Sequence, residues 1–208
     1  PIIFCVIYSK IFRNIINSQE GKMYILNIIL NMNLVMVATL IMAMLIAEEK
    51  EKNTLRTLML TSLSPVEFLI GKALITIFIS VIVNIAIFFM LGIQLQYLLM
   101  YFIITTAVLI SMVEIGAVIG IISKNQMATG TIGTPLGLFL FMIPTLSGLN
   151  KTFYKIATLL PNYNSIVILK KVFEGKNIIE GSGYNIFVIF ALVFFYFFRC
   201  CLFILPTN

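Results

Sequence analysis

The sequence has no tryptophan, no histidine and no aspartate, and its eight acidic residues are all glutamates. A Ser-His-Asp triad, a zinc site with histidine ligands and a pair of intramembrane aspartates are therefore excluded. The three cysteines, Cys5, Cys200 and Cys201, show neither metal-ligand spacing nor a disulfide framework. We interpret them as apolar filler, with acylation of the adjacent pair as the alternative.

Charged residues are scarce as well. They make up 11% of the 208 residues, whereas about a quarter of a soluble domain is charged. Apolar residues make up 61% of the sequence, and the mean hydropathy is +1.09. This composition predicts an integral, multi-pass protein of a lipid bilayer, and we expect no nucleic-acid partner.

Five apolar stretches are long enough to cross a bilayer as helices, because about 20 residues with a rise of about 1.5 Å span about 30 Å. They are residues 25–47, 65–91, 97–122, 127–149 and 184–205. Residues 1–9 are apolar but too short to span, and we interpret them as the tail of a helix truncated at its N-terminus. The predicted fold is all-α: a polytopic membrane helix bundle in one transmembrane domain, residues 1–208. It has five fairly complete spans plus this remnant, and six spans in the intact protein.

Polar stretches separate these spans. Residues 10–24 are predicted to form a loop, and residues 92–96 and 123–126 to form tight turns. Residues 150–184 are rich in lysine and interrupted by proline and glycine. We expect them to form a structured loop that contains a short amphipathic helix from about Ser165 to Phe173.

Polar and small residues within the spans indicate how the helices pack. An unpaired amide in a bilayer is costly. We therefore expect interhelical hydrogen bonds from three asparagines: Asn31, Asn33 and Asn84. Close helix packing, rather than a gating role, is expected at two small-xxx-small pairs: Gly116 with Gly120, and Gly133 with Gly137.

Glu114 is the only acid deep inside a predicted span. A charge at mid-bilayer costs at least about 2.5–3.5 kcal/mol, so such a residue usually faces the bundle interior or a water path. Two roles stay open for it. Glu114 lines the substrate path or binds a cation, or it is a protonated acid that hydrogen-bonds to a neighbouring helix.

Residues 48–72 are the one long charged and amphipathic interruption of the apolar sequence. Residues 51–63 are predicted to form a helix in the membrane surface. Its apolar side would consist of Leu55, Leu58, Met59 and Leu63. The motif Ser64-Pro65-Val66-Glu67 is a capping box with proline at the first helical position, so it predicts a new helix from Pro65. Lys72, two turns later, is expected to extend to the membrane interface.

This stretch resembles the permease subunits of ABC-2-type exporters. Those permeases have E-x-E-x-G-T-L-x-x-L after their second span, then a turn containing Ser/Thr-Pro, then G-K at the start of the third span. The matching residues here are Glu49, Glu51, Thr54, Leu55, Leu58, Ser64, Pro65, Gly71 and Lys72. The glycine of the motif is replaced by Asn53, a residue that tolerates left-handed backbone conformations. Residues 150–184 resemble the external region before the last span of the family, with Pro161 and Gly175 at similar places.

The resemblance implies a six-helix permease subunit in a bacterial cytoplasmic membrane. It would pair with a second copy or a homologue and with cytoplasmic ATPase subunits, which hydrolyse ATP with Mg²⁺. This chain itself would have no catalytic residue, cofactor or metal, since the phosphate-binding motif G-x-x-x-x-G-K-[ST] is absent. Residues 48–72 would be the cytoplasmic coupling segment. The expected ATPase-coupling residues are Glu48, Glu49, Glu51, Lys52, Thr54, Leu55, Leu58 and Met59.

Several alternatives stay open at this point. The acids of residues 48–51 could be a solvated helix start that complements the helix dipole, and the apolar residues could rest on lipid or on the protein's own helices. The positive-inside rule mildly opposes a cytoplasmic coupling segment, because its side carries six basic residues against eight. An ATP-independent carrier that couples through Glu114, or a membrane-embedded lipid-modifying enzyme or protease, is the competing function. The carrier lacks a second buried ionisable partner, and the enzyme lacks a converging acid and base.

Overall fold

The computed structural model describes residues 3, 7, 19–52, 65–175 and 182–191, and the regular structure in these ranges is entirely helical. Four helical stretches are long and apolar enough to cross a membrane. They are Gly21–Glu51, Glu67–Met90, Leu95–Ile122 and Gln126–Leu146. The all-helical bundle is confirmed, as are four of the five predicted spans. Of the fifth, residues 183–191 are helical and the rest lies outside the described residues, as does most of the predicted N-terminal remnant.

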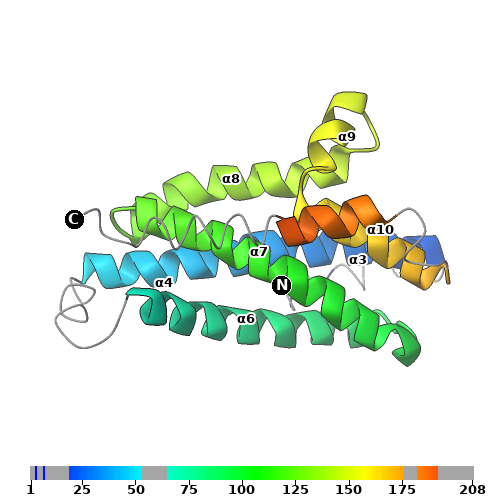
Figure 1. Cartoon of the computed structure of the whole chain (residues 1–208), viewed down its shortest axis with the longest axis horizontal. Helices are drawn as coiled ribbons and strands as arrows, with labels where there is room; N and C mark the ends of the chain where they lie inside the picture. Colours follow the sequence, from blue (N-terminus) through cyan, green and yellow to red (C-terminus); the bar gives the residue numbers. More distant parts are fainter. Residues whose placement is uncertain (1–2, 4–6, 8–18, 53–64, 176–181, 192–208) are drawn as a thin grey trace.

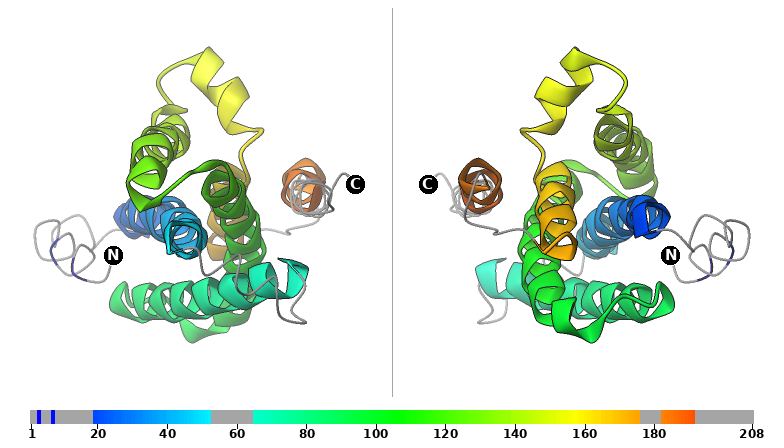
Figure 2. Two further views of the ribbon diagram at one scale, coloured as in Figure 1. Left: turned by 90° about the vertical axis from the view of Figure 1, so that its left-hand side faces the viewer. Right: turned by 90° about the vertical axis from the view of Figure 1, so that its right-hand side faces the viewer.

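The first span is one continuous rod made of α3 (Gln19–Met32), the π-helical segment η1 (Asn33–Thr39) and α4 (Leu40–Glu51). It lies at the centre of the bundle, where it packs against α6 (Pro65–Met90), α7 (Leu98–Ile122) and α8 (Gln126–Leu146). Figure 2 shows this central rod in both end views. The loop predicted for residues 10–24 is wrong from Gln19 onward, because polar residues at the margin of a span can extend a helix beyond the apolar core.

Short turns join the spans in the predicted places. Gly92 has a φ of 60°, a left-handed conformation that suits glycine, and it ends α6 before the 3₁₀ turn η2 (Leu95–Tyr97). Residues 123–125 connect α7 to α8, and the Asn125 side chain accepts a hydrogen bond from the Ala128 amide at 2.7 Å. The predicted helix start at Pro65 is confirmed, whereas Ser64 and residues 53–63 of the predicted surface helix lie outside the described residues. Glu51, where that helix was predicted to begin, is the last residue of α4.

Residues 150–175 contain two helices, α9 (Lys151–Ala157) and α10 (Pro161–Phe173). The predicted helix up to Phe173 is confirmed, but it begins earlier than Ser165, because Pro161 occupies its first turn. α10 packs against α7 and α3, and the Asn162 amide donates to the Leu140 carbonyl at 3.0 Å. This segment is therefore part of the bundle, while α9 contacts α8 and projects from it (Figure 1).

Glycines bring α7 close to the central rod. A Cβ atom on Gly116 would overlap the Thr39 carbonyl oxygen, and a Cβ on Gly120 would lie 2.8 Å from the Ala43 carbonyl oxygen. On α8, a Cβ at Gly133 would lie 2.8 Å from Leu40 Cδ2. A Cβ at Gly137 would lie 3.4 Å from Met36 Sδ, in ordinary van der Waals contact. The predicted packing role of both small-xxx-small pairs is confirmed.

Hydrogen bonds add polar contacts to this core. Asn33 Nδ2 donates to Asn84 Oδ1 at 2.7 Å, which joins η1 to α6 as predicted. Thr39 Oγ1 donates to the Met112 carbonyl at 3.1 Å, which joins η1 to α7. The prediction was wrong for Asn31, whose Nδ2 donates to Asn27 Oδ1 at 2.7 Å, because residues four apart are neighbours on one helix.

The bundle has two distinct ends. At one end lie the end of α4, the start of α6 and the turn between α7 and α8; at the other lie the start of α3 and the turn between α6 and α7 (Figure 1). The first of these ends carries the charged residues that the family resemblance singles out.

Candidate functional site

The candidate site is the charged end of α4, defined as residues 48–52. Five charged residues stand in a row there, Glu48 to Lys52, at the point where the apolar rod ends. Because successive helical residues point about 100° apart, such a row can reach several neighbouring helices at once. Three of the five residues do so, each toward a different helix.

Lys50 contacts the C-terminal end of α7. Its Nζ donates to the Ser123 carbonyl at 3.0 Å, to the Gly120 carbonyl at 3.4 Å and, at a shorter distance, to the Ile121 carbonyl. The last carbonyls of a helix lack donors within the helix and carry the negative end of its dipole. A half-buried ammonium is therefore a favourable cap for them. The role of Lys50 was not predicted from the sequence, because its partners are backbone carbonyls, which every residue has.

Glu51 contacts the N-terminal end of α8. Its Oε2 accepts a hydrogen bond from the Gln126 amide at 3.0 Å. The first amides of a helix lack acceptors within the helix, and the dipole favours a negative charge there. Glu51 thus adds to the capping of α8 that the Asn125 side chain provides at Ala128.

Glu49 contacts α6. Its Oε1 lies 2.7 Å from Lys72 Nζ, and both side chains are 21% exposed. The ammonium of Lys72 also lies 5.7 Å from the centre of the Phe68 ring. Lys72, which is predicted to extend to the membrane interface, binds the end of α4 through this ion pair. The ion pair brings together the chain on either side of residues 53–64.

Glu48 and Lys52 form the remaining pair. Their side chains lie 2.5 Å apart at helical i,i+4 spacing, with 35% and 62% of the side chain exposed. The hydrogen bond and charge of Glu48 raise the pKa of Lys52, which keeps its positive charge. Exposed pairs of this kind contribute little to stability. Because both side chains are partly exposed, they are accessible for other contacts.

The other predicted site residues fall into two groups. Thr54, Leu55, Leu58 and Met59 lie outside the described residues. Glu114 lies within α7, away from the charged end of α4, and it is half-buried. One of its oxygens, Oε2, is buried and has no hydrogen-bond partner among the described residues. No group of three or more metal-ligating side chains occurs within the described ranges.

Comparison with known proteins identifies the family. The model of a family described as ABC-2 family transporter protein matches residues 7–199, which is most of the chain. No curated protein and no solved structure matches the sequence. The match agrees with the four helices that are long and apolar enough to cross a membrane. The chain belongs to the ABC-2 family of transporter membrane proteins.

Proposed function

We propose that the chain is the permease subunit of an ATP-binding-cassette exporter in a bacterial cytoplasmic membrane. A separate cytoplasmic ATPase subunit would bind ATP and Mg²⁺, since this sequence contains no phosphate-binding motif. Membership of the ABC-2 family supports the transport role. A second copy or a homologue of the chain would complete the transporter.

The observation that carries the proposal is the set of contacts made by the charged end of α4. Glu49, Lys50 and Glu51 contact α6, α7 and α8 respectively. Residues 53–64 connect this end to Pro65, where α6 starts. A push on residues 53–64 would therefore act on both flanking helices and, through Lys50 and Glu51, on α7 and α8.

The expected ATPase contacts follow from this arrangement. Glu48 and Lys52 pair with each other rather than with another helix, so they are the members of the charged row that are available to a partner. Thr54, Leu55, Leu58 and Met59 continue the sequence beyond them. We assign these six residues to the ATPase surface, and Glu49 and Glu51 to holding that surface in place. The charged end of α4 then faces the cytoplasm.

Glu114 is assigned to the substrate path. Among the described residues, the other acids within the candidate spans lie near a span end, whereas Glu114 lies well inside α7. Its Oε2, which has no hydrogen-bond partner among the described residues, supports a role beyond packing. A carboxyl group within a membrane bundle is costly unless a ligand, water or a neighbouring helix solvates it.

Photo-crosslinking in membranes of the source organism tests the proposal. A photoreactive amino acid at Met59 should capture a protein with an ATP-binding-cassette motif, identified by mass spectrometry. The matched control places the same group at Leu95, which is 67% exposed at the opposite end of the bundle and should capture no ATPase. Equal capture at both positions, or no ATPase at Met59, would refute the assignment.

Phosphate release provides a second measurement. The complex isolated through the crosslinked chain should hydrolyse ATP, and hydrolysis should require the partner, because the sequence contains no G-x-x-x-x-G-K-[ST] motif. Hydrolysis by the isolated chain would contradict the proposed division of labour.

A further inference from the structure

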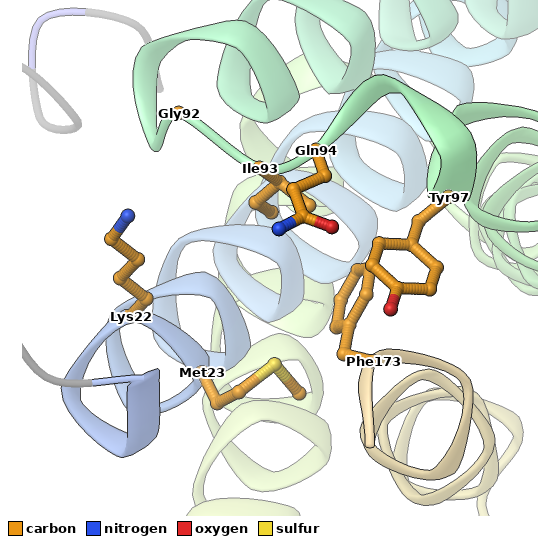
Figure 3. A pocket seen from close by; sticks show the side chains of 7 residues that line it. All are labelled: Lys22, Met23, Gly92, Ile93, Gln94, Tyr97 and Phe173. Carbon is orange, nitrogen blue, oxygen red and sulfur yellow. The ribbon is translucent and has the colours of Figure 1, made fainter. Parts of the chain in front are cut away.

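A pocket lies at the end of the bundle opposite the charged end of α4. Its volume is about 340 Å³, and seven residues line it: Lys22, Met23, Gly92, Ile93, Gln94, Tyr97 and Phe173. They come from the start of α3, the turn between α6 and α7, and the last residue of α10. Three segments distant in the sequence thus form one cavity (Figure 3). Pockets for small molecules have volumes of about 300–1,000 Å³, so this one suits a small ligand or part of a larger one.

One side of the pocket is polar and cationic. In Figure 3 the Lys22 amino group points toward the turn that carries Gly92, and the Gln94 amide lies between it and the aromatic rings. Lys22 makes no hydrogen bond or ion pair with another described residue. Gln94 Oε1 accepts a hydrogen bond from Gln96 Nε2 at 2.6 Å, so the amide nitrogen of Gln94 keeps its donors for a ligand.

The other side of the pocket is apolar. The rings of Tyr97 and Phe173 meet edge to face, with centroids 5.3 Å apart. Met23 and Ile93 are half-buried beside them, and Phe173 is 6% exposed. The pocket therefore offers hydrogen-bond donors and an apolar surface side by side.

The position of Lys22 makes its charge significant. It lies in the first turn of α3, where the helix dipole adds to its positive potential. All seven lining residues are described, and none of them is acidic. Glu174 follows Phe173 but is exposed and does not line the cavity. An anionic ligand would pair with the Lys22 ammonium, which has no partner among the described residues.

We propose that this pocket binds an anionic amphiphile. Its phosphate or carboxylate head group would accept hydrogen bonds from Lys22 and Gln94, and its apolar part would lie against Met23, Ile93 and Phe173. The pocket is at the end of the spanning helices, which is where the head group of a membrane amphiphile would be found. The inference concerns binding by the chain alone and does not depend on an ATPase partner.

Native mass spectrometry of the purified full chain in a non-ionic detergent tests this inference. Lysophosphatidylglycerol is the probe, with zwitterionic lysophosphatidylcholine as the matched neutral lipid. One lysophosphatidylglycerol should stay bound. Lys22→Gln should weaken its binding at least about tenfold, because the head group loses a hydrogen bond to a charged donor. Lys151→Gln removes the same charge from exposed α9, outside the pocket, and should leave binding unchanged.

A second variant guards against a folding artefact. Gln94→Glu changes an exposed residue by one atom and places a carboxylate near Lys22, so it should abolish binding while the chain stays folded. Equal loss of lysophosphatidylglycerol binding in Lys22→Gln and Lys151→Gln, or equal binding of the two lipids, would overturn the proposal.

Competition by inorganic phosphate distinguishes a membrane amphiphile from free phosphate as the ligand. Weak competition by phosphate supports an amphiphile as the ligand. If phosphate bound as tightly as lysophosphatidylglycerol, the apolar side of the pocket would contribute nothing to binding, and the proposed amphiphile would be wrong.

Discussion

Replacing Lys50 by methionine removes the ammonium that caps α7 and keeps the apolar length of the side chain. Three carbonyl oxygens, those of Gly120, Ile121 and Ser123, then lose their donor. A hydrogen bond that involves a charged group contributes about 1.5–3 kcal/mol, and a favourable charge at a helix end about 0.3–1 kcal/mol. Since Lys50 is half-buried and its three bonds share one ammonium, we expect a loss of about 2 kcal/mol.

Hydrogen exchange measures this loss where it occurs. About 2 kcal/mol corresponds to about a 30-fold change in an opening equilibrium. Amide exchange in the last turn of α7 and the turn after it should accelerate by about that factor in Lys50→Met. The Ser123 amide, which bonds to the Ile119 carbonyl at 3.0 Å, is the most informative reporter. Exchange in the first half of α7 should stay unchanged, because the cap acts only on the last turn.

Lys52→Met is the matched control. It removes the same charge two residues later, where the side chain is 62% exposed and pairs only with Glu48. Loss of an exposed pair costs about 0–1 kcal/mol, so exchange in α7 should not change. If Lys50→Met exchanged like wild type, or if Lys52→Met matched it, the capping argument would be refuted. Under the proposed function, Lys50→Met should also lower transport per ATP hydrolysed while the ATPase remains bound.

Three further predictions concern the bundle. Gly116→Ala should lower thermal stability by about 1–3 kcal/mol because its Cβ meets a backbone carbonyl of η1, whereas the same change at Gly148, with open space around it, should have little effect in the same melting assay. Glu49→Lys should destabilise the protein by placing two cations together, and adding Lys72→Glu should restore at least about 1 kcal/mol; a double-mutant cycle without coupling would contradict the ion pair. Glu114→Gln should reduce transport in reconstituted vesicles with normal assembly, and wild-type transport would exclude a role in the substrate path.

Much of the architecture follows from local features of the sequence. The span from Pro65, the turn at Gly92 and the span up to Ile122 are confirmed, because long apolar runs, proline at a helix start and glycine in a turn act within a few residues. The loop predicted up to residue 24 was wrong, since α3 begins at Gln19. A polar residue next to a span is compatible with both a loop and a helix, and local composition does not distinguish them.

Contacts between helices were predicted less completely. The Asn33–Asn84 hydrogen bond was expected, since an asparagine within a span needs a partner. Asn31 is also a buried asparagine of the first span, yet its partner is Asn27 in the same helix. The rotation of each helix decides between these outcomes, and that rotation depends on packing across the whole bundle.

The sequence by itself determined that this protein is a helical membrane bundle with a charged segment at residues 48–72, because hydrophobicity, length and the family motif are properties of consecutive residues. Only the tertiary structure decided what the charged row does. Glu49, Lys50 and Glu51 are neighbours in sequence, but Lys72, the end of α7 and the start of α8 are brought to them by helix packing. Two of those three partners are backbone groups, which exist at every residue and become specific only when a helix ends beside the right side chain.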